Sequence, residues 1–171
     1  MKQRSCGKAV LALGMLAMAG TVWAAGWLVY AKPQAKFKLS YPDGWKLTEW
    51  QQAPAEEEKS FRADLPLIKL PGARHILETS HPAGPVVRLN GPHQAEVTVA
   101  AIPLPALPAY QMSQALAKDR LGDSKDGRRA RVHAQNGATA LGIVIMKAPP
   151  GQFDQLNKSY FDEIAKRFEA R

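Results

Sequence analysis

An uncharged run of 23 residues, 9–31, constrains this chain more than any other feature of its sequence. Three basic residues and no acidic residue come before it. A basic end followed by an apolar stretch is typical of a secretory signal peptide. Signal peptidase cuts after small residues, and the run offers two such cleavage sites, after Ala24 and after Ala31. The run therefore predicts that the rest of the chain leaves the cytoplasm.

The same run is long enough to remain in the membrane as an anchor. At 1.5 Å per residue a helix of this length spans about 35 Å, and the hydrocarbon core of a bilayer is about 30 Å thick. Both interpretations stay open, and both predict the same division of the chain. Residues 1–31 form a signal peptide or membrane anchor, and residues 32–171 form a single exported domain. We expect this domain in a bacterial periplasm, either soluble or anchored to the inner membrane by an N-terminal helix over residues 9–31.

Cysteine usage narrows the chemistry that the exported domain can perform. The only cysteine, Cys6, lies before the apolar run, so residues 32–171 contain no thiol. Disulfides, cysteine nucleophiles and thiolate metal sites are therefore excluded from the domain. A lipid anchor is not expected either, because the cysteine of a lipoprotein directly follows its apolar run.

Length and charge indicate one globular unit with a moderately basic surface. Residues 32–171 suffice for one domain and are too few for two ordinary ones. They carry 20 basic and 15 acidic residues, because three of the 23 basic residues and none of the 15 acidic residues come earlier. This small excess, in a domain outside the cytoplasm, predicts no binding of nucleic acid.

Alternating apolar and polar residues predict strands along the first half of the domain. Residues 37–41 and 45–50 are expected to form a hairpin about the Pro-Asp-Gly turn at 42–44. Residues 51–59, which include three consecutive glutamates, are expected to form a polar loop. Further strands are expected at residues 60–65, 68–70, 75–79, 86–89 and 95–102, several of them at sheet edges because prolines interrupt the series.

Helical periodicity predicts helices over residues 110–121 and 153–169. Between them a charged loop, 122–127, precedes a hairpin whose Asn136-Gly137 turn suits the type I′ geometry. This order of elements predicts an α+β fold, in which two helices cover a mainly antiparallel sheet. Trp45 and Phe168 lie on apolar faces of their elements, so we expect both rings to be largely buried.

The two ends of the domain resemble one family. A strand that ends in an aromatic residue and continues as Pro-Asp-Gly-Trp, at 42–45, is similar to the first hairpin of the PsbP-like family, which includes the DcrB-like bacterial envelope proteins. The apolar stripe over residues 160–168 is similar to the terminal helix of that family. The resemblance implies an α/β/α sandwich and an exported accessory protein without known catalysis, and it carries over no functional residue.

No motif for catalysis or metal binding outweighs an ordinary structural role for its residues. The histidines are His75, His81, His93 and His133, and none has the i,i+4 spacing of a zinc-binding pair. Asp64, Ser80 and His81 are the only residues that suggest hydrolysis, and no nucleophile-elbow motif surrounds the serine. We therefore predict no metal, no cofactor and no enzymatic activity.

A basic stretch between residues 118 and 131 is the candidate binding surface. Its cations are Lys118, Arg120, Lys125, Arg128, Arg129 and Arg131. Outside the cytoplasm they would meet anionic lipid headgroups, polyanionic glycans or an acidic partner. Three aspartates lie among them, which favours the alternative of an ordinary solvated surface.

The sequence as a whole predicts a non-enzymatic accessory or binding protein of the bacterial envelope. Its partner would be an envelope protein or an anionic surface, bound through a sheet edge or the basic stretch. The alternative is a hydrolase or ligand-binding enzyme that acts on envelope polymers. A pocket that gathers Asp64, Ser80 and His81 would favour that alternative.

Overall fold

Two antiparallel sheets form the framework of the protein. The computed structural model describes residues 26–67, 80–103 and 119–171. The larger sheet has six strands in the order β3-β4-β5-β8-β7-β6, and the smaller has three in the order β1-β2-β9. The strands are β1 (Trp27–Tyr30), β2 (Phe37–Pro42), β3 (Lys46–Trp50), β4 (Val86–Asn90), β5 (Glu96–Pro103), β6 (Arg120–Asp123), β7 (Arg129–Asn136), β8 (Ala140–Ala148) and β9 (Glu169–Ala170).

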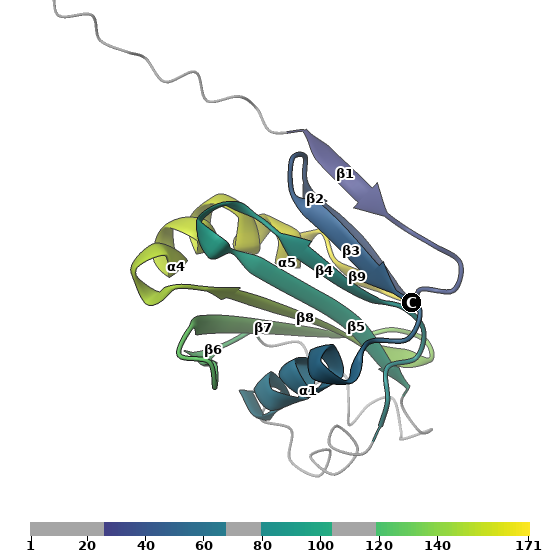
Figure 1. Cartoon of the computed structure of the whole chain (residues 1–171). Helices are drawn as coiled ribbons and strands as arrows, with labels where there is room; N and C mark the ends of the chain where they lie inside the picture. Colours follow the sequence, from purple (N-terminus) through teal and green to yellow (C-terminus); the bar gives the residue numbers. More distant parts are fainter. Residues whose placement is uncertain (1–25, 68–79, 104–118) are drawn as a thin grey trace, which may run out of the picture.

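Helices cover both faces of the larger sheet. The first, α1 (Ala55–Asp64), continues into the short 3-10 helix η1 (Leu65–Leu67), and η2 (Pro92–Gln94) links β4 to β5. The C-terminal helix comprises α4 (Pro150–Leu156), a π-helical turn η3 (Asn157–Phe161) and α5 (Asp162–Lys166). Figure 1 shows α1 on one face of the sheet and α4–α5 on the other. None of the described helices is long and apolar enough to cross a bilayer. The layered α+β arrangement confirms the predicted fold class.

The central strands β5 and β8 separate two apolar cores. In β5, Val97 and Val99 join the core beneath the C-terminal helix, whereas Ala100 and Ile102 join the core beneath α1. This alternation follows from the pleat of a strand, which sends successive side chains to opposite faces. All nine residues of β8 are buried, as expected for a central strand covered by a helix on each face.

Several sequence predictions are confirmed in the second half of the chain. β5 occupies almost the predicted range, and β7 and β8 pair as a hairpin that ends at Asn136 and Leu141. The closing helix begins at Pro150 and ends at Lys166, three residues earlier than predicted at each end. The rings of Trp45 and Phe168 are both buried, as predicted.

The predicted hairpin over residues 37–50 is wrong. β2 pairs with β1 and β9, whereas β3 pairs with β4, so the two strands belong to different sheets. Gly44 has a φ of 81°, which only glycine adopts readily, and it turns the chain between them. Trp45 then packs its ring edge-on against Tyr160 of the C-terminal helix. The strands themselves are correct, and only their pairing differs.

Residues 55–64 form a helix rather than the predicted loop and strand. Pro54 precedes the helix, three glutamates occupy its first turn and Arg62 its last, which is the charge order that a helix dipole favours. Glu58 and Arg62 form an ion pair at i,i+4 spacing, 2.8 Å apart. Phe61 and Leu65 pack beneath the sheet. The two apolar positions i and i+4 are the helical signal in this segment.

Residues 120–123 form strand β6, where the sequence predicted the last two residues of a helix and the first two of a charged loop. β6 pairs with β7 from Arg120–Val132 to Asp123–Arg129, so it extends the larger sheet by one edge strand. The remainder of the predicted helix, 110–118, lies outside the described residues. The predicted strands at 68–70 and 75–79 lie outside them as well.

The first strand lies within the range that the sequence assigns to the signal peptide or anchor. Trp27–Tyr30 form β1 and pair with Leu39–Pro42 of the domain. Tyr30 is buried and its ring stacks on Phe37, with centroids 5.7 Å apart. The first described strand therefore starts at Trp27, before residue 32.

Candidate functional site

The most distinctive polar feature of the protein is a buried ion pair between Lys147 of β8 and Asp64 of α1. Lys147 Nζ lies 3.1 Å from Asp64 Oδ2, and only 3% and 2% of the two side chains are exposed. Charges are costly to bury because they lose their hydration, and such groups persist where partners satisfy them. The pair therefore marks a site where the fold depends on precise polar contacts.

Strand and helix geometry bring these two residues together. Ile143 and Ile145 of β8 belong to the core beneath α1, and the strand alternation places Lys147 on the same face. Asp64 is the last residue of α1, one turn beyond the buried Phe61. The apolar contacts of Phe61 and Leu65 thus hold Asp64 over the end of β8.

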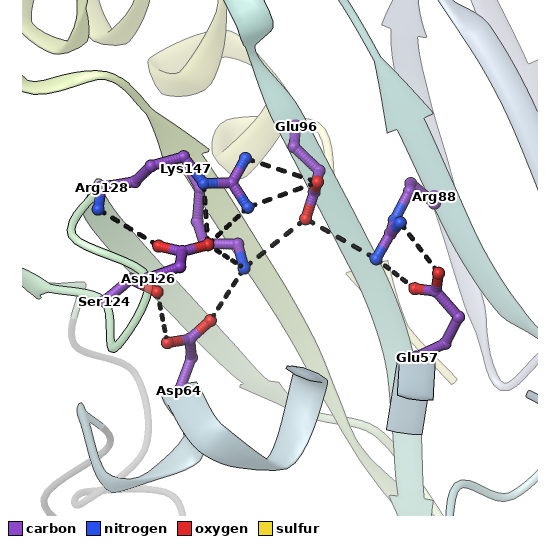
Figure 2. Close-up of polar contacts among 8 residues, drawn as sticks. All are labelled: Glu57, Asp64, Arg88, Glu96, Ser124, Asp126, Arg128 and Lys147. Carbon is purple, nitrogen blue, oxygen red and sulfur yellow. Dashed lines mark hydrogen bonds and ion pairs between the residues drawn. The ribbon is translucent and has the colours of Figure 1, made fainter. Parts of the chain in front are cut away.

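Three further charged residues, Glu96, Asp126 and Arg128, surround this pair. We call these three residues together with Asp64 and Lys147 the ionic cluster. Lys147 Nζ lies 3.5 Å from Glu96 Oε1 and 3.4 Å from Asp126 Oδ2. Arg128 contacts the same two acids, 3.4 Å from Glu96 Oε2 and 2.7 Å from Asp126 Oδ2. Figure 2 shows these side chains converging from α1, β5, β8 and the turn between β6 and β7.

The ionic cluster is extended on both sides by neighbouring polar residues. Ser124 donates its hydroxyl proton to Asp64 Oδ1 over 2.7 Å. On the other side Glu96 Oε1 lies 3.8 Å from Arg88 of β4, which in turn pairs with Glu57 of α1. The contacts tie both ends of α1 to the sheet (Figure 2).

A pocket of about 340 Å³ opens between α1 and the β6–β7 turn, beside the ionic cluster. Glu56, Lys59 and Asp64 line it from the helix, Lys125 and Asp126 line it from the turn, and Lys147 forms part of its wall. This volume lies at the lower end of the range for small-molecule sites. Its lining mixes both signs of charge, so it does not select a ligand of one charge.

Electrostatics fix the protonation of the exposed side of the cluster. Burial acts to raise the pKa of Asp126, but hydrogen bonds from Arg128 and the charge of Lys147 outweigh it and hold that pKa well below its usual range. Burial likewise acts to lower the pKa of Arg128, and its bond to Asp126 raises it above its ordinary value. Both groups are charged at neutral pH.

The arrangement of the ionic cluster suits a structural role, in which it holds elements of the fold together, better than a catalytic one. Each carboxylate of the cluster contacts a cation, and Lys147 contacts three carboxylates. The hydroxyl of Ser124 is bonded to Asp64, and no histidine contacts it in the part of the chain that the structure describes. A nucleophile or general base needs a lone pair free to reach a substrate. The cluster instead joins α1, two central strands and a turn.

Low pH should weaken the ionic cluster and so lower the stability of the fold. The pKa of Asp126 is depressed in the fold, so its contribution to stability is present above its unfolded value of about 3.9 and is lost as the pH falls through the folded value. We expect the free energy of unfolding to decline as the pH falls below about 4. In the Asp126→Asn variant the decline should be shallower, as measured by urea unfolding at several pH values. An equally steep decline in the variant would show that protonation of Asp126 does not cause the loss of stability.

At the sequence level, no protein family and no curated protein matches this chain. Among solved structures, the fold is similar to the solution structure of cyanobacterial PsbP (CyanoP) from Synechocystis sp. PCC 6803. That likeness covers 92% of this chain and 100% of the other, at 13% sequence identity and a TM-score of 0.47. At this identity the likeness concerns the fold alone.

The described cations of the predicted basic stretch lie in two environments: some are exposed to solvent, and others are bound by acidic residues. Lys118 lies outside the described residues, Lys125 is exposed in the turn, and Arg120 is partly exposed on β6. Arg129 pairs with Asp123 over 3.1 Å at the surface, and Arg128 belongs to the ionic cluster. Acids thus bind several of these cations.

Arg131 is buried rather than offered to a partner. Its guanidinium donates to Asp119, to Asp162 and, over 2.8 Å, to Asn157 in the π-helical turn. His133 Nδ1 lies 2.6 Å from the other oxygen of Asp119. The hydrogen bond to His133, aided by Arg131, lowers the pKa of Asp119 although burial opposes this. This second set of contacts joins β7 to the C-terminal helix.

The residues that suggest hydrolysis do not assemble. Asp64 accepts from Ser124 and Lys147, whereas His81 Nδ1 lies 2.8 Å from Glu58. The backbone carbonyl of Ser80 accepts a hydrogen bond from Arg62. His93 is an exposed residue of η2, and His75 lies outside the described residues. Within residues 26–67, 80–103 and 119–171, no three histidine or acidic side chains form a metal site.

Sequence reasoning missed Lys147, the centre of the ionic cluster. Judged by hydrophobicity alone, the predicted strand ends at Met146. The lysine that follows directly was therefore not assigned to the strand. The alternation of the strand was the available signal, because Lys147 lies on the same face as Ile143 and Ile145. A lysine in that row, in a central strand, predicts a buried cation that requires carboxylate partners.

Proposed function

We propose that this chain is a non-enzymatic accessory protein of the bacterial envelope, periplasmic or tethered to the inner membrane, that binds a partner. The observation that carries the proposal is the ionic cluster. Its most buried ionisable groups, Lys147 and Asp64, are bound to each other and to neighbours that hold the fold together. The chemistry at this position therefore supports a rigid binding domain.

Export is supported by the way the apolar run enters the fold. Residues 9–25 carry no charge and lead directly to Gly26 and β1. Cleavage after Ala24 would leave β1 intact, whereas cleavage after Ala31 would remove it together with the buried Tyr30. A cleaved form of the protein therefore begins at Ala25. The uncleaved form keeps β1 at the end of a membrane anchor.

The binding surface that we propose is the exposed part of the predicted basic stretch. It consists of Lys125 in the β6–β7 turn and Arg129 at the start of β7. Arg120 is paired with Val132, so it adds a partly exposed cation on the other face of the sheet. Arginine offers planar donors to carboxylate or phosphate groups, and exposed lysine adds a second cation. Lys118, the first cation of the predicted stretch, lies outside the described residues, whereas Arg128 and Arg131 are bound by acids beneath this surface. The expected partner is an acidic envelope protein or an anionic surface.

Removing two of these exposed charges should weaken binding without unfolding the domain. We expect the Lys125→Gln/Arg129→Gln variant to lose most of its recovery on cross-linking in envelope extracts, and the wild type to lose recovery as salt rises, because exposed charges are screened beyond about 8–10 Å. Lys46→Gln/Lys158→Gln removes the same charge from other exposed positions and serves as control. Equal recovery of both variants at low salt would contradict the proposed surface.

A further inference from the structure

The first strand, β1, has one edge that no described residue pairs with. β1 pairs with β2 alone in that part of the chain, and Figure 1 shows it at the outer edge of the smaller sheet. Asp43 N donates to the carbonyl of Gly26 over 2.7 Å, and the two strands keep this register. Hydrogen-bonded and non-hydrogen-bonded pairs alternate in an antiparallel ladder. The backbone groups of Leu28 therefore bond to β2, whereas those of Trp27 and Val29 point to the outer edge.

β1 lacks the features that protect an outer edge. Natural edge strands avoid pairing with other chains by means of charged residues, prolines or bulges. β1 has the sequence Trp-Leu-Val-Tyr and pairs with β2 without a bulge. Leu28 is 43% exposed and Val29 58% exposed. These two residues are consecutive, so their side chains lie on opposite faces of the smaller sheet. A partner that covers both must therefore pair with the edge itself.

A second copy of β1 fits this edge. In an antiparallel pair centred on Leu28, the outward backbone groups of Trp27 in each copy exchange hydrogen bonds with those of Val29 in the other. Every outward N–H and C=O of the strand is then bonded. Directly opposite residues share one face of a sheet, so Leu28 contacts its own copy on one face and Val29 contacts Trp27 on the other. Both exposed side chains thus gain an apolar neighbour.

The chain that precedes β1 favours a second copy over a different partner. Pairing of Trp27–Val29 alone covers far less than the roughly 1,000 Å² that a specific complex of free proteins needs. The uncharged residues 9–25 lead directly to Gly26, so copies anchored by them hold β1 at the same distance from the membrane. Tethering of this kind raises the effective concentration of the two matching edges and compensates for their small area.

We propose that two copies of this chain, anchored in one membrane, pair through β1 and join their smaller sheets into one continuous sheet. This inference rests on the tethered form of the proposed function. The two strands form an isologous contact, in which the same residues of both copies meet about a two-fold axis. The larger sheet takes no part in the pairing, so Lys125 and Arg129 stay available to the proposed partner. The dimer therefore presents the basic surface twice.

Disulfide cross-linking tests the pairing in the full-length chain. Cys6→Ser removes the native thiol, after which Leu28→Cys, Val29→Cys or Leu121→Cys supplies a single new one. In the proposed register the two copies of position 28 have Cα atoms about 4.5 Å apart, within reach of a disulfide. The two copies of position 29 are diagonal neighbours about 7–8 Å apart, which is too far.

The yield of cross-linked dimer should follow this register rather than exposure. In phosphatidylcholine vesicles under mild oxidation, we expect several-fold more dimer from Leu28→Cys than from Val29→Cys or Leu121→Cys, although positions 29 and 121 are both more exposed, at 58%. Equal yields from the three variants, or a higher yield at position 29, would overturn the proposal.

Leu28→Lys separates strand pairing from association of the apolar segments. Two lysines would face each other in the pair, and like charges directly opposite destabilise a sheet. With donor and acceptor dyes on the native Cys6, we expect energy transfer between copies in the same vesicles to fall about two-fold in Leu28→Lys and to stay unchanged in Leu121→Lys. Circular dichroism should show the same fold in both variants, because both positions are exposed.

Unchanged energy transfer in Leu28→Lys would mean that the apolar segments alone associate, which refutes pairing through β1. Export and partner capture are measured in cells, whereas these experiments use the purified chain in vesicles. Failure of the proposed function is therefore distinct from failure of the dimer.

Discussion

Replacing Lys147 with methionine is expected to lower the free energy of unfolding by about 3–5 kcal/mol. Methionine fills much of the same volume, but the carboxylate of Asp64 would stay buried, and among the described residues the hydroxyl of Ser124 would be its remaining partner. A buried charge without a partner lowers the free energy of unfolding by far more than the intact ion pair raises it. Urea unfolding at pH 7, followed by far-ultraviolet circular dichroism, measures the difference.

Two further variants show whether the cost comes from the buried charge. In Lys147→Met/Asp64→Leu both charges of the buried pair are absent, and we expect much of the stability to return because the carboxylate of Asp64 is no longer buried without its cation. Arg129→Gln breaks the surface pair with Asp123 and should change stability by less than about 1 kcal/mol. A Lys147→Met variant as stable as the wild type, or a double variant much weaker than the single one, would show that the ionic cluster does not hold α1 in place.

Replacing Phe168 with alanine is expected to cost about 3–5 kcal/mol, the range for large aromatic residues removed from a core. Phe168 is buried after the C-terminal helix, with its ring centroid 6.1 Å from that of Phe37 and 6.0 Å from that of His133. It also packs against Gly142 of the central strand β8. The ring thus joins both sheets to the helix, and calorimetry should show a large drop in Tm.

The matched control for Phe168 is an exposed hydrophobic residue. Leu121→Ala on β6 removes apolar atoms from the surface and should change stability by less than about 0.5 kcal/mol. A small effect of Phe168→Ala, comparable to that of Leu121→Ala, would contradict the packing of the helix end between the two sheets.

Local signals in the sequence were sufficient where pairing is local. The Asn136-Gly137 turn selects its own hairpin, and the apolar stripe of the closing helix predicts the face that it buries. The pairing of β2 gave no such signal, because one partner, β9, lies at the other end of the chain and the other, β1, has no turn motif before β2. Its partner β1 lies in the apolar run that precedes the domain, where a strand and a signal peptide have the same composition. Apolar character alone does not separate the two.

The ionic cluster was harder to predict because its members are distant in the sequence. Asp64, Glu96, Asp126 and Lys147 come from a helix, two strands and a turn that meet only in the folded chain. Reading residues 60–65 as a strand also placed Asp64 on the wrong type of element. The basic stretch and the aspartates within it were visible in the sequence. Glu96 and Asp162, which bind Arg128 and Arg131 from distant elements, were not.

The N terminus of the protein recovered from cells tests most directly whether an exported domain begins at β1. Intact-mass analysis of the chain from periplasmic and membrane fractions should give a protein that starts at Met1 or at Ala25, since both forms keep Trp27–Tyr30 in the fold. A stable protein that starts at Lys32, or a chain found only in the cytoplasmic fraction, would contradict the account.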